Sequence, residues 1–378
     1  MDINQIRSKI DSIDDELSNL IRERMSLSEE VALYKKKAGL PVLDRQRERD
    51  ILARITNEDD KYGEYVRILY SMIFDLSRSN QDKLISGSSE LSSAVKKALS
   101  DTPQLFPQKA TVACQGIEGA YSQIACDRLF SVPQIMYFNS FEGVFQSVAS
   151  GLCRYGILPI ENNLHGSVAE VYDLMKRYKF YIVRSIKLSI RHALMMKPGG
   201  KLSDIREIYS HNQAIGQCSS FLKDMKNATV KICENTAVAA KFVAESNRTD
   251  IAAISSVNCA ELYGLRIVND NVQNSDNNYT RFICISKDMQ IYPGTNKISL
   301  MFTISHRPGS LYSLLTKFAA LGLNMTKLES RPIPGRDFEF MFYCDLEASV
   351  YSDDVLNLLD ELENGPEQFV FLGSYTEI

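Results

Sequence analysis

Positively charged side chains stand on the apolar face of a helix near the start of the chain. Apolar residues recur at alternating three- and four-residue steps from Ile3 to Tyr34, which predicts one long helix packed against other helices. Arg24 occupies a position where this pattern requires an apolar residue, and Lys35 lies about 20° off the same line. An unpaired cation on such a stripe is costly unless an anion meets it. The two cations therefore indicate either side chains that reach solvent or pair with a carboxylate, or a buried site for an anionic ligand.

Arginine is also well suited to one particular kind of anion in this region. Arg24 and Arg47 suit a dicarboxylate, because a guanidinium group can donate two parallel hydrogen bonds to a carboxylate. Arg7 precedes Arg24 on the same helix by roughly 260° of rotation, so the two cannot reach one pocket together. Arg7 is then either a surface charge or part of a second copy of the site in a dimer.

Two more helices are predicted after the first, and no strand pattern precedes residue 85. Asp44 is the expected N-cap of a helix over 45–56, and a third helix is expected over 62–84. Ser77 and Gln81 are four residues apart and share one face of this third helix. The first unit is therefore predicted to be all-α.

These positions together resemble the active-site pattern of the all-helical chorismate mutases over residues 1–84. The matching residues are Arg7, Arg24, Lys35, Asp44, Arg47, Glu48, Ser77 and Gln81. The resemblance implies an intertwined dimer in which Arg7 crosses to the partner's site, with Lys35 and Gln81 on the ether oxygen of chorismate. It further implies that the three arginines bind carboxylates and that Glu48 binds the ring hydroxyl. Leu76 and Asn80 form an equally spaced alternative to Ser77 and Gln81.

Short apolar runs alternate with helical segments from residue 109, which predicts an α/β unit after a Ser-rich linker over 85–107. Three polar stretches lie within this predicted α/β unit. The loop 116–122 leaves a strand and opens a helix, where backbone N–H groups can hold an anion. The stretch 159–163 puts a carboxylate and an amide on a loop, and 278–282 sets a hydroxyl beside a cation at the start of a strand. Taken singly, each stretch is also explained by capping and turn chemistry.

Together these stretches resemble the prephenate dehydratases over about residues 109–288. The matching segments are Gly116–Ser122, Pro159–Gly166, Ser210-His211 with Gln217, and Thr280-Arg281-Phe282, whereas Ile117 and Asn163 depart from the common pattern in ways that concern loop shape. The resemblance implies a two-lobed fold like that of solute-binding proteins. It implies that the hydroxyl of Thr280 assists departure of the ring hydroxyl, which needs help from Arg281 or Glu161 because threonine is a poor acid. The substrate would be positioned by Asn162, Ser122, Ser210, Gln217, Arg281 and Phe282.

The last 82 residues predict the order strand, helix, strand, strand, helix, strand, which is the ferredoxin-like arrangement. This segment, 297–378, resembles the ACT domain of phenylalanine-sensitive dehydratases, whose amino-acid site lies between paired domains. The residues that carry the resemblance are Gly309, Ser310, Leu311, Glu329, Ser330, Arg331 and Pro332. The alternative is a docking domain without a ligand.

Composition limits what else the 378-residue chain does. A net charge of -4 provides no electrostatic footprint for nucleic acid or a membrane, and no 18-residue apolar run or signal peptide is present. Eight Cys without a C-x-x-C pair and four His outside ligand spacing predict a reducing cytoplasm and neither a metal nor another cofactor.

We therefore expect a multidomain enzyme with a helical mutase domain over 1–84, a dehydratase domain over 108–288 and an ACT domain over 297–378. Its ligands would be chorismate, prephenate and phenylalanine, and it would form a dimer or tetramer. The alternative is a non-catalytic small-molecule sensor with a helical dimerisation module.

Overall fold

The computed structural model describes residues 2–56, 60–85, 89–306, 308–333, 339–365 and 368–378. These residues form two compact units. The first combines Met1–Lys96 with Leu300–Phe369, and the second combines Lys97–Ser299 with Val370–Ile378. The boundaries fall within two strands and one helix, so the chain passes between the units in regular secondary structure.

Helices make up the chain before residue 109. They are α1 (Ile3–Ala38), α2 (Arg45–Ile55), α3 (Gly63–Ile85) and α4 (Glu90–Asp101). A capping box starts α1, because Asp2 accepts a hydrogen bond from the backbone of Gln5 and Gln5 accepts one in return. Asp44 caps α2 as expected, accepting from the backbone N–H of Arg47 at 3.0 Å. Among the described residues this region contains no strand.

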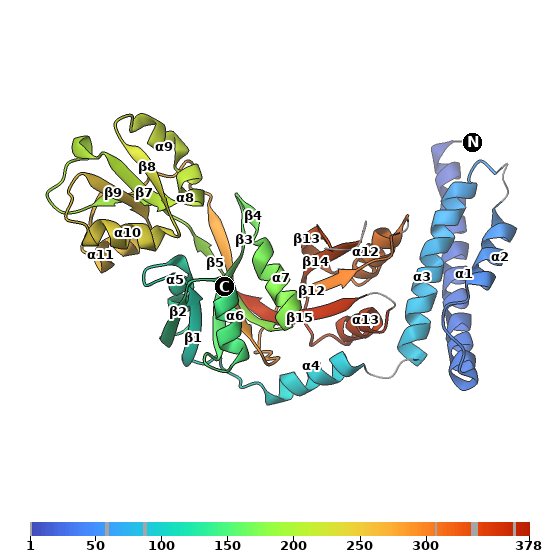
Figure 1. Ribbon diagram of the computed structural model, residues 1–378. Helices are drawn as coiled ribbons and strands as arrows, with labels where there is room; N and C mark the ends of the chain where they lie inside the picture. The colour runs from blue at the N-terminus through green and yellow to red at the C-terminus, as the bar shows by residue number, and fades with distance from the viewer. Residues whose placement is uncertain (1, 57–59, 86–88, 307, 334–338, 366–367) are drawn as a thin grey trace. The chain divides into compact units, whose positions relative to one another are not determined.

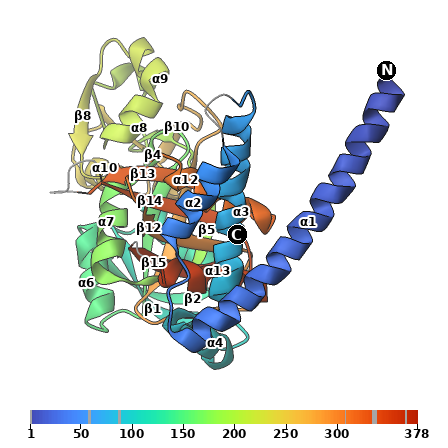
Figure 2. The ribbon, with the colours of Figure 1, turned by 90° about the vertical axis from the view of Figure 1, so that its right-hand side faces the viewer.

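The face that α1 turns toward α3 differs from the predicted apolar stripe. Ser28 and Ala32 are the buried residues of α1, whereas Leu27, Val31 and Tyr34 are 44–68 % exposed. The stripe repeats every 3.5 residues and so drifts around a helix of 3.6 residues per turn. The later stripe residues are therefore exposed in the single chain. The N-terminal half of α1 extends away from α2 and α3, with its isoleucines exposed (Figure 2).

Strands and helices follow one another from residue 297 in the predicted order. The elements are β12 (Lys297–Thr303), α12 (Ser310–Ala320), β13 (Asn324–Pro332), β14 (Phe340–Glu347), α13 (Asp353–Glu363) and β15 (Phe369–Glu377). Antiparallel pairing joins β13 to β14 along their length.

The first lobe of the second unit is built on a mixed sheet in the strand order β5-β11-β3-β1-β2. The strands are β1 (Lys109–Gln115), β2 (Val132–Phe138), β3 (Tyr155–Asn162), β5 (Tyr181–Ser189) and β11 (Tyr279–Ser286), and the short β4 (Gly166–Ser167) pairs with β3. Its helices are α5 (Tyr121–Leu129), α6 (Phe141–Ala149) and α7 (Ala169–Tyr178). A core of side chains from α5 and four of these strands fills one face of the sheet.

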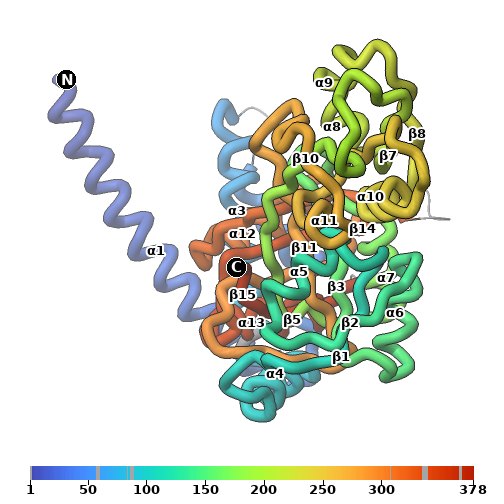
Figure 3. Tube along the Cα trace, turned by 90° about the vertical axis from the view of Figure 1, so that its left-hand side faces the viewer, coloured from blue at the N-terminus to red at the C-terminus, as the bar shows by residue number. Residues whose placement is uncertain are grey.

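A second sheet forms the other lobe, in the order β10-β6-β9-β7-β8. Figure 1 labels β7, β8 and β9 of this sheet. Its strands are β6 (Ala193–Met196), β7 (Glu207–His211), β8 (Thr229–Cys233), β9 (Ile251–Ser255) and β10 (Arg266–Asn269). The helices are α8 (Asn212–Gln217), α9 (Ser219–Asp224), α10 (Thr236–Glu245) and α11 (Val257–Leu262), with a 3-10 turn at Leu202–Asp204. The chain passes between the lobes twice, from β5 to β6 and from β10 to β11 (Figure 3).

Several expected element boundaries are wrong. Glu161 and Asn162, expected on a loop, belong to β3, and Thr280 and Arg281 lie inside β11. The stretch 185–196 is divided between β5 and β6, and the stretch 213–225 is divided between α8 and α9 at Cys218. Pairing with β3 extends β11 to the residues around Thr280, which local patterns alone do not reveal.

Candidate functional sites

A polar cluster between α1 and α3 contains three of the predicted mutase residues. The ammonium of Lys35 donates to Oε1 of Gln81 at 3.3 Å, and the amide nitrogen of Gln81 donates to the hydroxyls of Ser28 at 3.0 Å and Ser77 at 3.3 Å. The two serine hydroxyls are 2.6 Å apart. Gln81 and Ser77 are each only 7 % exposed, so these hydrogen bonds replace water that the side chains have lost.

The structure separates this cluster from the alternative pair on α3. Asn80 lies outside it and donates to Glu29 at 3.3 Å, while Leu76 and Asn80 both line a different cavity. Geometry thus places Ser77 and Gln81, rather than Leu76 and Asn80, beside Lys35. Ser28 was missed by the sequence analysis, although it precedes Lys35 by two helical turns and so shares its face.

The arginines predicted to bind carboxylates differ in their surroundings in the single chain. Arg24 is half-buried, with its guanidinium 5.6 Å from the ring centroid of Phe74, in a cavity of about 260 Å³. Arg7 and Arg47 are exposed, and Asp44 serves as the cap of α2. Their assignment to one site stays a prediction.

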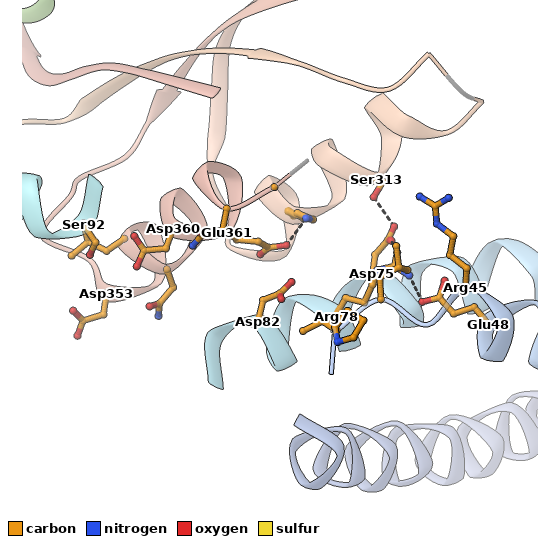
Figure 4. A pocket seen from close by; sticks show the side chains of 18 of the residues that line it. Arg45, Glu48, Asp75, Arg78, Asp82, Ser92, Ser313, Asp353, Asp360 and Glu361 are labelled. Atoms are coloured by element: carbon orange, nitrogen blue, oxygen red, sulfur yellow. Dashed lines mark hydrogen bonds and ion pairs between the residues drawn. The ribbon is translucent and has the colours of Figure 1, made fainter. Parts of the chain in front are cut away.

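Glu48 lines a larger cavity of about 1250 Å³ between α2, α3 and α13 (Figure 4). It forms an ion pair with Arg78, which also pairs with Asp75. Ser313 of α12 donates to Asp75 at 2.7 Å, so hydrogen bonds and ion pairs connect this helix to Glu48. On the same cavity, burial and the nearby charge of Glu361 raise the pKa of Asp82.

In the second unit, Asn162 of β3 and Thr280 of β11 face each other across paired strands. The amide nitrogen of Asn162 donates to the hydroxyl of Thr280 at 3.0 Å, to Oδ1 of Asn278 at 2.8 Å and to the carbonyl of Tyr279 at 3.0 Å. Its Oδ1 accepts from the backbone N–H groups of Leu164 and His165, which fixes the amide orientation. Because Thr280 accepts from Asn162, its own hydroxyl proton can point toward a ligand.

Glu161 and Arg281 form an ion pair of 2.8 Å on the opposite face of the sheet from Thr280. Successive residues of a strand point to opposite faces, and both of these residues immediately adjoin the Asn162–Thr280 pair. Direct assistance of Thr280 by Arg281 or Glu161, as the sequence analysis expected, does not fit this arrangement.

The remaining predicted dehydratase residues are mostly buried. Ser122 lies in the first turn of α5, and Ser210 donates to the carbonyl of Ile254 at 2.7 Å. Phe282 is 3 % exposed within the hydrophobic core of the first lobe, so its side chain stabilises the fold there. Gln217 lies at the end of α8, with its Oε1 2.8 Å from Nε2 of His192.

Two polar residues near these positions were not among the sequence predictions. His192 lies where the chain crosses between the lobes, and burial lowers its pKa against the opposing effect of the hydrogen bond to Gln217. A lone histidine outside ligand spacing carries no sequence signal of its own. Asn278 is fully buried and receives the hydrogen bond from Asn162; its place two residues before Thr280 was the available signal.

A third candidate site lies at the start of α12. Gly309, Ser310 and Leu311 line a cavity of about 410 Å³, and Gly309 caps the helix with φ 85°, a conformation that favours glycine. The predicted segment from Glu329 to Pro332 belongs to β13 and is not part of this lining.

Metal-binding clusters and membrane-spanning helices are both absent from the part of the chain that the structure describes. No group of His, Cys, Asp or Glu there is arranged to hold a metal ion. No helix in the same residues has the length and apolar character needed to cross a membrane.

Comparison with known proteins connects both units to two enzyme families. The family model for prephenate dehydratase matches residues 112–290, and the model for chorismate mutase type II matches residues 6–82. The bifunctional chorismate mutase/prephenate dehydratase of Escherichia coli (strain K12) is 30 % identical, over 98 % of this chain and 95 % of its own length. Arogenate dehydratase/prephenate dehydratase 2 of Arabidopsis thaliana is 35 % identical, over 74 % of this chain and 80 % of its own.

A solved structure of a prephenate dehydratase is also similar to this chain. The prephenate dehydratase of Arthrobacter aurescens in complex with L-Phe aligns with a TM-score of 0.63 and 26 % identity, covering 70 % of this chain and 90 % of that one. A helical mutase unit followed by a two-lobed dehydratase unit defines a class of two-activity enzymes of aromatic metabolism. The chain belongs to the family of bifunctional chorismate mutase/prephenate dehydratases.

Proposed function

We propose that this chain rearranges chorismate to prephenate and then converts prephenate to phenylpyruvate, with feedback inhibition by phenylalanine. The observation that carries the proposal is the match to the bifunctional E. coli enzyme over nearly the full length of both chains. The polar clusters around Lys35 and Thr280 lie in the two segments that match the two enzyme families.

The mutase step is a [3,3] rearrangement in which no proton is transferred. Catalysis must come from holding a compact conformer and from stabilising the ether oxygen as its C–O bond breaks. Lys35 supplies a charged donor for that oxygen. Gln81 orients the ammonium through its carbonyl, and Ser28 and Ser77 hold the Gln81 amide in turn.

Two features support a mutase site shared between two chains. Arg7 is exposed on the part of α1 that extends away from α2 and α3, together with Ile3, Ile6 and Ile10. An apolar helix face of this length is typical of a helix that packs against a second chain. A dimer would bury it and bring the partner's Arg7 to the carboxylates held by Arg24 and Arg47.

The dehydratase step removes the ring hydroxyl and the ring carboxylate of prephenate, giving phenylpyruvate, water and CO2. Hydroxide is a poor leaving group unless a donor protonates it. Thr280 is the proposed hydrogen-bond donor to that oxygen, because Asn162 occupies one lone pair of its own oxygen and leaves its O–H for the substrate. The proton that turns the departing hydroxide into water comes in the net reaction from solvent. The electrons of the C–CO2 bond then complete the aromatic ring as the C–O bond breaks.

Feedback is proposed at an ACT domain with ferredoxin-like order over 297–378. The neighbouring structure from Arthrobacter aurescens holds L-Phe. The cavity at Gly309 lies before the N-terminus of α12, where the helix dipole favours the carboxylate of an amino acid. Glu329–Pro332 would complete the site from a paired domain, which also requires an oligomer.

A second candidate substrate is arogenate, the counterpart of prephenate with an amino group in place of the keto group. The Arabidopsis relative named for both activities is 35 % identical over 308 residues. The two substrates share the ring on which elimination takes place and differ only in the side chain.

One experiment tests these assignments. Purified full-length protein is given chorismate, prephenate or arogenate, with and without phenylalanine, and prephenate, phenylpyruvate and phenylalanine are measured as products. We expect turnover of chorismate and prephenate and inhibition by phenylalanine. Faster turnover of arogenate than of prephenate would favour the second candidate, and absence of turnover would refute the enzyme assignment.

A further inference from the structure

Five charged side chains gather on the face of the first-lobe sheet that lies opposite Thr280. This rear charge cluster consists of Glu161, Lys187, Arg281, Lys297 and Glu377. The register places Arg281 between Glu161 of β3 and Lys187 of β5, and all five residues belong to the second unit. Nothing in the proposed reaction uses Lys187, Lys297 or Glu377.

Glu377 contacts every cation of the rear charge cluster. Its Oε1 lies 2.8 Å from the ammonium of Lys297 and 2.9 Å from that of Lys187, and its Oε2 lies 3.7 Å from Nη1 of Arg281. Burial alone would raise the pKa of Glu377. The hydrogen bonds from Lys297 and Lys187 and the charge of Arg281 outweigh burial and lower the pKa to about 2.

The backbone around Glu377 is held as firmly as its carboxylate. The end of β15 runs parallel to β5, with Glu377 in register with Ser185. The N–H of Ile378 donates to the carbonyl of Ser185 at 2.9 Å, and the N–H of Lys187 donates to the carbonyl of Ile378 at 3.0 Å. The backbone of β15 therefore fixes the Glu377 carboxylate next to Arg281, on the face of the sheet opposite Thr280.

Arg281 connects the rear charge cluster to the predicted catalytic residue. Its side chain is 4 % exposed and pairs with Glu161 on one side and Glu377 on the other. Thr280 precedes it directly, so a shift of the Arg281 backbone moves the Thr280 hydroxyl on the opposite face. A displacement of about 1 Å at a reacting group can cost about 100-fold in rate.

We propose that Glu377 is a positioning residue for the dehydratase reaction, holding Arg281 so that the neighbouring Thr280 hydroxyl stays aligned with the substrate. The inference rests on the proposed dehydratase function of Thr280. It makes β15, a strand that begins in the first unit, part of the support of the dehydratase site. Without Glu377, three cations of the cluster would face one carboxylate, and Arg281 would shift toward Glu161.

The test is Glu377→Gln in the full-length protein, which removes the charge and keeps the shape. We expect the dehydratase kcat to fall by about 10- to 100-fold with KM changed by less than about threefold, since geometry rather than substrate contact is lost. Mutase activity of the same sample should be unchanged, and Glu377→Asp should recover part of the dehydratase rate. Glu347→Gln, at the exposed end of β14, is the matched control and should behave as the parent.

A double variant separates positioning from general stability. Glu377→Gln takes from Lys297, which is 9 % exposed, the carboxylate with which it forms an ion pair, and this lowers the midpoint of thermal unfolding. Adding Lys297→Met removes that buried charge and should restore the midpoint while the dehydratase kcat stays low.

Two results would overturn the proposal: recovery of dehydratase kcat in the double variant, or a parent-like kcat in Glu377→Gln. If the parent protein itself fails to convert prephenate, the proposed function fails instead, and the two failures are distinguished by that one measurement.

Discussion

Hydrogen bonds of Asn162 restrict the orientation of the Thr280 hydroxyl, which is a weak acid. The amide of Asn162 is oriented by two backbone N–H donors and in turn donates to the Thr280 oxygen. An isolated threonine hydroxyl rotates freely and accepts or donates equally well. In this pair one lone pair of the oxygen is already taken, and the proposed mechanism uses the O–H as a donor to the substrate.

Thr280→Ala should lower dehydratase kcat by about 100-fold or more, because the donor to the departing hydroxyl is lost. Thr280→Ser is the matched control, since it keeps the hydroxyl and should retain most of the rate. Conversion of prephenate to phenylpyruvate is the measurement, with mutase activity followed in the same samples. A dehydratase rate near that of the parent in the alanine variant would rule out the role.

Gln81 and Asn80 provide a direct comparison of the two possible registers on α3. Gln81→Ala should lower mutase kcat by about 100-fold, because Lys35 loses the carbonyl that orients it. Asn80→Ala removes only a contact to Glu29 and should leave the rate within about threefold. Conversion of chorismate to prephenate measures both. The opposite order of effects would establish the Leu76 and Asn80 register.

At the scale of elements, β15 approaches β5 so closely that only glycine fits at one position. Gly373 has φ 142°, and a Cβ added there would lie 2.3 Å from the carbonyl oxygen of Ile182. Two backbones in contact leave no flexible group that could move aside. The placement of Glu377 therefore depends on Gly373 four residues earlier on the same strand.

Gly373→Ala should destabilise the second unit by about 1–3 kcal/mol and lower dehydratase activity, because β15 is displaced from β5. Gly294→Ala is the matched control: Gly294 has φ 82° but nothing within 4 Å of the added Cβ. The Gly294→Ala variant shows the effect of the backbone strain alone, without a steric clash. Thermal unfolding and conversion of prephenate are compared in both variants. Equal dehydratase loss in the two would refute the role of the close approach.

At the scale of the whole molecule, the proposed dimer concerns the long helix α1. The exposed isoleucines of α1 and the separation of Arg7 from Arg24 are both explained by a dimer with shared mutase sites.

Mixing two inactive variants tests this arrangement. Arg7→Ala and Arg24→Ala should each abolish the mutase reaction, because a carboxylate of the substrate loses its partner. After unfolding and refolding together, the pair should recover roughly a quarter of the parent rate, since half the molecules are mixed dimers with one intact site each. Conversion of chorismate is the measurement. Without recovery in a sample shown to contain mixed dimers, the shared site is refuted.

The sequence alone was sufficient for the features that depend on local chemistry. Helical periodicity, the cap at Asp44 and the strand–helix order after residue 297 follow from neighbouring residues. The motifs around Ser77, Asn162 and Thr280 are contiguous or four residues apart, so they are recognisable before folding. The family assignment rests on such segments and was correct.

Tertiary structure decided the facing of side chains and the contacts between distant segments. Whether Glu161 points toward Thr280 depends on strand register, which a shift of one residue reverses, and Arg281 points away from Thr280 because β11 includes both residues. Ser28 meets Gln81 only because α1 packs on α3, and Glu377 reaches Arg281 from 96 positions away in the sequence. No local sequence pattern encodes such long-range contacts, because they arise from the packing of whole helices and strands rather than from the preferences of neighbouring residues.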